Sequence, residues 1–170
     1  MVAHASRLRL LRGERPQARR LRHHENQAAW SSRPRHMSQQ DSFSIIYRIP
    51  YSDCTVGNHV YYARYLDWLE RARNEFFRKI GVTFQSLVDQ GIMLPVVSSH
   101  VDYKGAARYD DEVKIEVAVT EVGSVKLTFD YRITLVSTGK LITTAQTVHV
   151  CTNLQEKPQR LPKALVDALS

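Results

Sequence analysis

The sequence predicts an α+β fold in which a curved antiparallel sheet of about five strands packs on one long helix. Its 170 residues suit one domain. The second half of the chain holds three runs with an apolar face, joined by short connections that contain glycine, which is typical of antiparallel hairpins. A single helical pattern precedes these runs, so it cannot cross over between parallel strands.

The first half of the domain is predicted to be a strand, a loop and the long helix. Phe43–Pro50 is a short strand ended by proline, and residues 51–57 (YSDCTVG) form a polar loop. Asn58 is a suitable N-cap and Gly81 suits the C′ position, so residues 59–80 would make a helix of roughly 33 Å. The stripe that predicts it has spacings of three and four: Tyr61, Tyr65, Leu69, Ala72, Phe76 and Ile80.

The exposed face of this helix carries acids and bases at spacings that favour ion pairs. We expect these to be Glu70 with Arg73, Asp67 with Arg71, and Glu75 with Lys79. Because about 16 Å of helix separates residues 59 and 70, Glu70 is not expected to share a site with the start of its own helix.

The rest of the chain is predicted to complete the sheet. A short helical stretch, Phe84–Gln90, leads into Ile92–Tyr103. The three alternating runs then cover residues 113–120, 125–135 and 141–151. A terminal helix is expected within residues 158–170.

Charge and composition exclude several classes of function. The net charge of +7 lies entirely in residues 1–36, where nine arginines face two glutamates, while residues 37–170 hold 15 bases and 15 acids. A basic surface for nucleic acid on the domain is therefore not expected. No apolar run is long enough for a membrane span. The two cysteines suit a reducing, cytoplasmic location, and no cluster suggests a metal site.

Residues 1–36 are predicted to be a disordered tail, and residues 37–170 the domain. Three interpretations of this tail are open. It is a mitochondrial-type transit peptide, a tail that binds an anionic surface, or upstream sequence that is not part of the native protein. We favour the third, in which the functional protein starts at Met37.

Two segments carry a resemblance to a known family. Residues 51–73 read YSDCTVGNHVYYARYLDWLERAR, and residues 103–115 read YKGAARYDDEVKI. They resemble the hot-dog-fold acyl-CoA thioesterases of the 4-hydroxybenzoyl-CoA thioesterase, YbgC and FadM type, and the resemblance spans the whole predicted domain. The chain departs from that pattern at three positions. Thr55 replaces the usual catalytic aspartate, Tyr62 replaces a histidine of some YbgC-like members, and Ala106 replaces a proline.

The resemblance implies hydrolysis of an acyl- or aroyl-CoA to the free acid and CoA, with the CoA thioester as substrate and no further cofactor. Hydrolysis needs a base for water and donors for the developing oxyanion. We expect Asp53 or His59, or both, to activate the water and Thr55 to position it; Tyr51 also matches the motif. Asp53 as a turn residue and His59 as a helix cap are the structural alternatives.

The start of the long helix is expected to polarise the thioester through unpaired backbone N–H groups of Val60, Tyr61 and Tyr62. The rings of Tyr61, Tyr62 and Tyr65 are candidates for the acyl slot, or alternatively for dimer packing. Lys104 and Arg108 are expected to contact the CoA phosphates.

The family also implies a dimer, or a tetramer built from it, with sites at the interface. Sheet edges that need covering favour the same expectation. Two alternatives to the enzyme remain open from the sequence: a non-catalytic protein that binds acyl-CoA or acyl-carrier protein, and a hydroxyacyl-thioester dehydratase.

Overall fold

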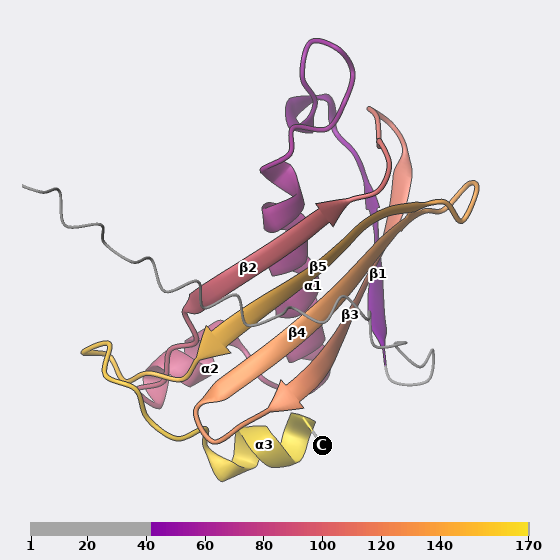
Figure 1. The fold of residues 1–170 in the computed structure, drawn as a ribbon. Helices are drawn as coiled ribbons and strands as arrows, with labels where there is room; N and C mark the ends of the chain where they lie inside the picture. Colours follow the sequence, from indigo (N-terminus) through magenta and orange to yellow (C-terminus); the bar gives the residue numbers. More distant parts are fainter. Residues whose placement is uncertain (1–41, 170) are drawn as a thin grey trace, which may run out of the picture. The chain divides into compact units, whose positions relative to one another are not determined.

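The computed structural model describes residues 42–169, which form one antiparallel sheet with helices beside it (Figure 1). The sheet has five strands in the order β1-β3-β4-β5-β2. The strands are β1 (Phe43–Arg48), β2 (Val96–Tyr103), β3 (Glu112–Val122), β4 (Lys126–Leu135) and β5 (Leu141–Val150). The helices are the short 3₁₀ helix η1 (Tyr51–Asp53), α1 (Arg64–Lys79), α2 (Phe84–Asp89) and α3 (Lys163–Leu169).

The core lies between α1 and the sheet, as the two apolar patterns predicted. Trp68, Leu69 and Ala72 of α1 are buried, and so are Ile115 of β3 and Phe129 of β4. In Figure 1, α1 lies across one face of the strands. The α+β fold with a curved antiparallel sheet on one long helix is therefore confirmed.

The predicted start of α1 was wrong. The helix begins at Arg64 rather than near residue 59, and its 16 residues span about 24 Å. The preceding residues make other bonds: Val60 N–H donates to Ala107 O (3.1 Å), and Tyr61 N–H donates to Asp53 O (2.9 Å). The N-cap of α1 is Ala63, so Asn58, which has a φ of 54° and lies five residues earlier, is not the N-cap.

The predicted ion pairs along α1 were also wrong, because three of the cations contact side chains of strands β1 and β5 instead. Arg73 Nη1 lies 3.1 Å from His149 Nε2 on β5. Arg71 lies over the ring of Tyr47, 4.9 Å from its centroid, and Lys79 lies over the ring of Phe43. The pairs that do form on the helix surface are Arg64 with Asp67 and Glu75 with Arg78.

The edge strand β2 differs from the other strands in its exposure. The first five residues of β2 are exposed, including Val97, whose exposed fraction is 57%. β2 pairs with β5 along one side, so its other side is a free edge within residues 42–169. No helix among those residues is long and apolar enough to cross a membrane. The predictions for the tail, residues 1–36, lie outside the described residues.

Candidate functional site

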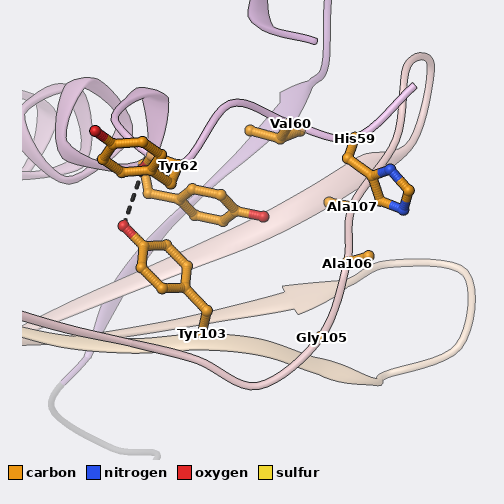
Figure 2. Close-up of a pocket in the computed structure, with 8 residues that line it drawn as sticks. His59, Val60, Tyr62, Tyr103, Gly105, Ala106 and Ala107 are labelled. Carbon is orange, nitrogen blue, oxygen red and sulfur yellow. Dashed lines mark hydrogen bonds between the residues drawn. The ribbon is translucent and has the colours of Figure 1, made fainter. Parts of the chain in front are cut away.

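A hollow of about 210 Å³ lies where the segment before α1 meets the end of β2 (Figure 2). Its wall comes from two stretches of chain that are far apart in the sequence and lie side by side. The lining residues are His59, Val60, Tyr62, Tyr65, Tyr103, Gly105, Ala106 and Ala107. The bond from Val60 N–H to Ala107 O joins the two stretches.

One of the three predicted backbone donors remains free beside this hollow. Of the three N–H groups predicted to be available, those of Val60 and Tyr61 are used within the fold, which corrects that prediction. Within residues 42–169, no hydrogen bond is formed by Tyr62 N–H. Tyr61 O accepts from Arg64 N–H at 2.9 Å, and in a trans peptide the adjoining N–H points the opposite way. Tyr62 N–H therefore points out of the N-terminal end of α1.

His59 is the one imidazole in the lining, and its side chain is exposed. Figure 2 places it at the opposite end of the labelled residues from Tyr62 and Tyr103. The loop that carries His59 is closed by two bonds from Thr55, whose N–H and Oγ1 donate to His59 O at 2.8 and 3.1 Å. Thr55 thus fixes the backbone of His59 but does not line the hollow.

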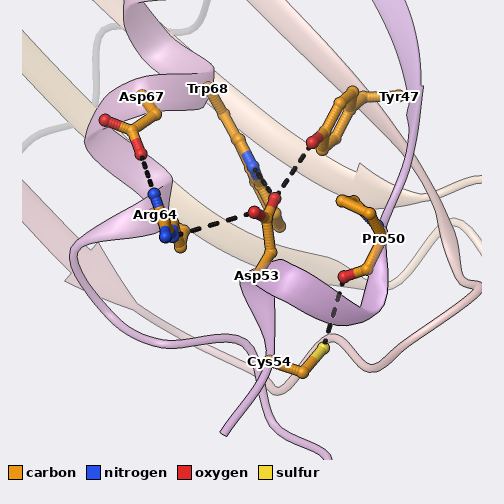
Figure 3. Close-up of polar contacts among 7 residues, drawn as sticks. All are labelled: Tyr47, Pro50, Asp53, Cys54, Arg64, Asp67 and Trp68. Carbon is orange, nitrogen blue, oxygen red and sulfur yellow. Dashed lines mark hydrogen bonds and ion pairs between the residues drawn. The ribbon is translucent and has the colours of Figure 1, made fainter.

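Asp53 lies outside the lining and is held by a polar cluster (Figure 3). Its Oδ2 accepts hydrogen bonds from Tyr47 Oη and Trp68 Nε1, both at 3.0 Å. Arg64 Nε lies 3.7 Å from its Oδ1. This buried carboxylate thereby joins β1, η1 and the first turns of α1. The nearby Cys54 donates weakly to Pro50 O.

The other predicted residues are divided between the hollow and the surface. Tyr65 is buried, and burial is the main cause that raises its pKa to about 12, so its hydroxyl stays protonated. The exposed ring of Tyr61 packs on that of Tyr62, with centroids 4.6 Å apart. Tyr51 lies edge-on to Tyr109 and is not in the lining.

The two residues predicted to contact the CoA phosphates, Lys104 and Arg108, lie at the edge of the hollow. Lys104 and Arg108 are exposed and bracket the lining residues 105–107. Lys104 Nζ lies 3.4 Å from Asp102 Oδ2, and Arg108 Nη1 donates to Asn58 O at 3.4 Å. Both side chains remain exposed to solvent despite these contacts.

Three lining residues were not predicted from the sequence: Tyr103, Gly105 and Ala107. The second family-like segment, residues 103–115, contained the signal, but nothing local indicated which of its residues face the helix. At Gly105 a Cβ would lie 3.1 Å from Leu141 O and 3.2 Å from Ile142 Cδ1, so a larger residue would crowd β5. Ala107 is fully buried against the loop of Val60.

Comparisons with known proteins agree with this architecture. The model of the family described as the thioesterase-like superfamily matches residues 49–169. The acyl-CoA thioesterase YbgC of Haemophilus influenzae is 34% identical over 125 residues, which are 72% of this chain and 90% of that protein. The acyl-CoA thioester hydrolase YbgC of Escherichia coli O6:H1 is 33% identical over 120 residues, covering 70% and 89%.

Solved structures of similar shape include enzymes with aromatic thioester substrates. A mutant 4-hydroxybenzoyl-CoA thioesterase in complex with 4-hydroxybenzoyl-CoA has a TM-score of 0.70 and 25% identity, covering 76% of this chain and 99% of its own. The DHNA-CoA thioesterase of Staphylococcus aureus has a TM-score of 0.69 and 27% identity, covering 74% and 85%.

Proposed function

Because this chain belongs to the thioesterase-like superfamily and is a thioester hydrolase of the hot-dog fold, we propose that it cleaves an acyl- or aroyl-CoA at the hollow before α1. The observation that carries this proposal is the free N–H of Tyr62 on the same wall as the imidazole of His59. A donor and a base are the two groups that hydrolysis of a thioester requires.

In the proposed reaction, Tyr62 N–H donates to the thioester carbonyl oxygen, and His59 accepts a proton from water as the water attacks the carbonyl carbon. The tetrahedral intermediate carries its negative charge on that oxygen, where the N–H and the positive end of α1 stabilise it. The C–S bond then breaks. The CoA thiolate leaves and takes up the proton from His59, and the free acid remains.

Thr55 and Asp53 act in this proposal by holding the loop. Thr55 binds the backbone oxygen of His59, and Asp53 binds Tyr61 N–H through its own carbonyl. The Asp53 carboxylate already accepts two hydrogen bonds, which makes it a weaker candidate for the base than His59. Tyr51 packs on Tyr109 and has no step in the reaction.

The acyl group is proposed to lie against Tyr62, Tyr65 and the neighbouring ring of Tyr61. The CoA phosphates are proposed to lie at Lys104 and Arg108, whose exposed side chains flank the same wall. An acyl-carrier-protein thioester would present the same pantetheine arm, so thiol release should be measured with both carriers.

One protomer supplies only part of the enclosure that a ligand needs. Pockets for small molecules usually measure about 300–1,000 Å³, and this hollow is smaller. We therefore propose that a second copy, paired along the free edge of β2, supplies the opposite wall.

The test is release of free thiol from short, long and aromatic acyl-CoAs, measured for the wild type and for His59→Ala. Loss of a general base should lower kcat/KM by about 10²–10⁴. Asp53→Asn is the matched variant, since it neutralises an acid outside the lining, and a smaller loss is expected. A greater loss for Asp53→Asn than for His59→Ala would assign the base to Asp53. No thiol release from any substrate would refute the function.

A further inference from the structure

Tyr103 makes a contact that crosses the hollow. It is the last residue of β2, and its hydroxyl donates to the backbone oxygen of Tyr62 at 3.0 Å (Figure 2). The two residues are 41 positions apart, and both line the hollow. The edge strand is thus bonded directly to the segment that precedes α1.

Within residues 42–169, this hydrogen bond is the one contact that fixes the backbone of Tyr62 itself. Within residues 42–169, Tyr62 N–H is free and Tyr62 O accepts only from Tyr103. The residue before it is held on both sides, because Tyr61 N–H donates to Asp53 O and Tyr61 O accepts from Arg64 N–H. On the C-terminal side of Tyr62, rotation about ψ is restrained by the Tyr103 hydroxyl.

The ring of Tyr103 is held in place by a contact with Tyr65, so its hydroxyl has a defined position. It meets the buried ring of Tyr65 edge to face, with centroids 5.2 Å apart, while its own exposed fraction is 47%. Burial, followed by the nearby Tyr62 phenol, raises the pKa of Tyr103 above its ordinary value. The hydroxyl therefore keeps its proton and remains a donor at neutral pH.

Resting on the proposed function, we infer that Tyr103 is a positioning residue. Its hydroxyl holds the Tyr62–Ala63 peptide, which follows the peptide that carries the free N–H, and so limits how far that N–H can move from the thioester oxyanion. A donor that stabilises a transition state is effective only when it is already oriented before charge develops. Arg64 N–H sets the direction of the Tyr62 N–H through Tyr61 O, and Tyr103 limits the displacement of Tyr62 without touching the reacting atoms. Its loss should therefore slow the chemical step and leave substrate binding largely unchanged.

The experiment compares kcat and KM for the wild type, Tyr103→Phe and Tyr109→Phe with one acyl-CoA. Tyr103→Phe removes the hydroxyl and keeps the ring. Tyr109 is the matched control, because it is similarly exposed and its hydroxyl has no hydrogen bond in the described part of the chain. We expect kcat of Tyr103→Phe to fall about tenfold with KM within about twofold, since a small displacement of a catalytic group costs up to about 10² in rate. Tyr109→Phe should match the wild type.

A spectroscopic measurement separates positioning from a general loss of structure. In the slow His59→Ala background, the carbonyl stretch of bound acyl-CoA should lie at a lower frequency than in water, because the N–H polarises it. Adding Tyr103→Phe should return part of that shift. An unchanged kcat and carbonyl frequency in Tyr103→Phe, with an active wild type, would overturn this inference alone. No turnover by the wild type would overturn the proposed function and this inference together.

Discussion

At the scale of single residues, long-range partners decide what a side chain does. Asp53 illustrates this, because its position in the family-like motif suggested a base or a turn residue. In the fold its carboxylate accepts from Tyr47 and from Trp68, which lie on β1 and α1. Neither partner is visible in the local pattern of the loop, so the sequence identified an important residue and left its role open.

His149 is a second residue whose role appears only in the fold. It lies in the strand pattern of residues 141–151, and it is 1% exposed. Its Nδ1 lies 2.9 Å from Leu94 O, and its Nε2 lies 3.0 Å from Thr147 Oγ1 and 3.1 Å from Arg73 Nη1. A neutral ring that donates from Nδ1 and accepts at Nε2 fits these contacts, with Thr147 and Arg73 sharing the single lone pair of Nε2. Burial, with Arg73 nearby, lowers its pKa to about 4.

This lowered pKa predicts a loss of stability in mild acid. The unfolded chain takes up a proton near the ordinary pKa of 6.5, while the folded chain resists it until about pH 4. The free energy of unfolding should therefore fall as the pH is lowered from about 6.5 to 4, by about 3 kcal/mol in total. Urea denaturation at a series of pH values measures it.

The variants for this test are His149→Gln and His100→Gln. His149→Gln should be less stable at neutral pH and should lack this part of the acid dependence. His100 lies on the exposed strand β2, where its Nε2 is 3.4 Å from Asp102 Oδ1; a contact this exposed contributes little, so His100→Gln should keep most of the wild-type dependence. Identical pH profiles for all three proteins would contradict the assignment.

At the scale of elements, the strands were predicted well and the start of the helix was not. The strand predicted at residues 125–135 is β4, Lys126–Leu135, because both its alternation and its short connections are local signals. The helix boundary failed because Asn58 is a good N-cap by type. Its side-chain amide oxygen does accept from a backbone N–H, but from that of Tyr109 at 3.1 Å, two residues beyond the lining residue Ala107.

Asn58 therefore provides a test of how the loop before α1 is held. Its φ of 54° favours asparagine or glycine, and its Oδ1 bonds Tyr109 N–H. Asn58→Gly loses the bond and keeps the conformation, whereas Asn58→Ala loses the bond and strains the backbone. We expect Asn58→Ala to be the less stable of the two by about 1 kcal/mol in urea denaturation. Equal stabilities would mean that the loop relaxes to another conformation.

At the scale of the whole molecule, the contacts that form the hollow could not be predicted from sequence patterns. Motifs located both walls, since residues 51–73 and 103–115 carried the resemblance. The way these walls meet depends on Val60 bonding Ala107 and on Tyr103 bonding Tyr62, which are contacts between distant segments. Period and spacing report which face of an element is buried, and they do not report which residue on another element it meets.

The free edge of β2 gives the last prediction, which concerns assembly. An exposed strand edge with apolar side chains such as Val97 is a template for pairing with another chain. We expect a species of about 39 kDa, twice the 19.6 kDa of one chain, in size-exclusion chromatography with light scattering. Ser99→Lys should favour the monomer, because antiparallel pairing of two copies of β2 near its centre brings like charges together. It should also lower thiol release if the second copy encloses the site.

Ser44→Lys is the matched control for this prediction. Ser44 is exposed on β1, at the opposite edge of the same sheet, so the substitution adds the same charge to a strand edge that the proposed dimer leaves free. It should remain a dimer with wild-type activity. Dissociation by Ser44→Lys and not by Ser99→Lys would place the interface at β1. A wild type of about 20 kDa at micromolar concentration would contradict self-association, and full activity in that monomer would show that one protomer encloses the substrate alone.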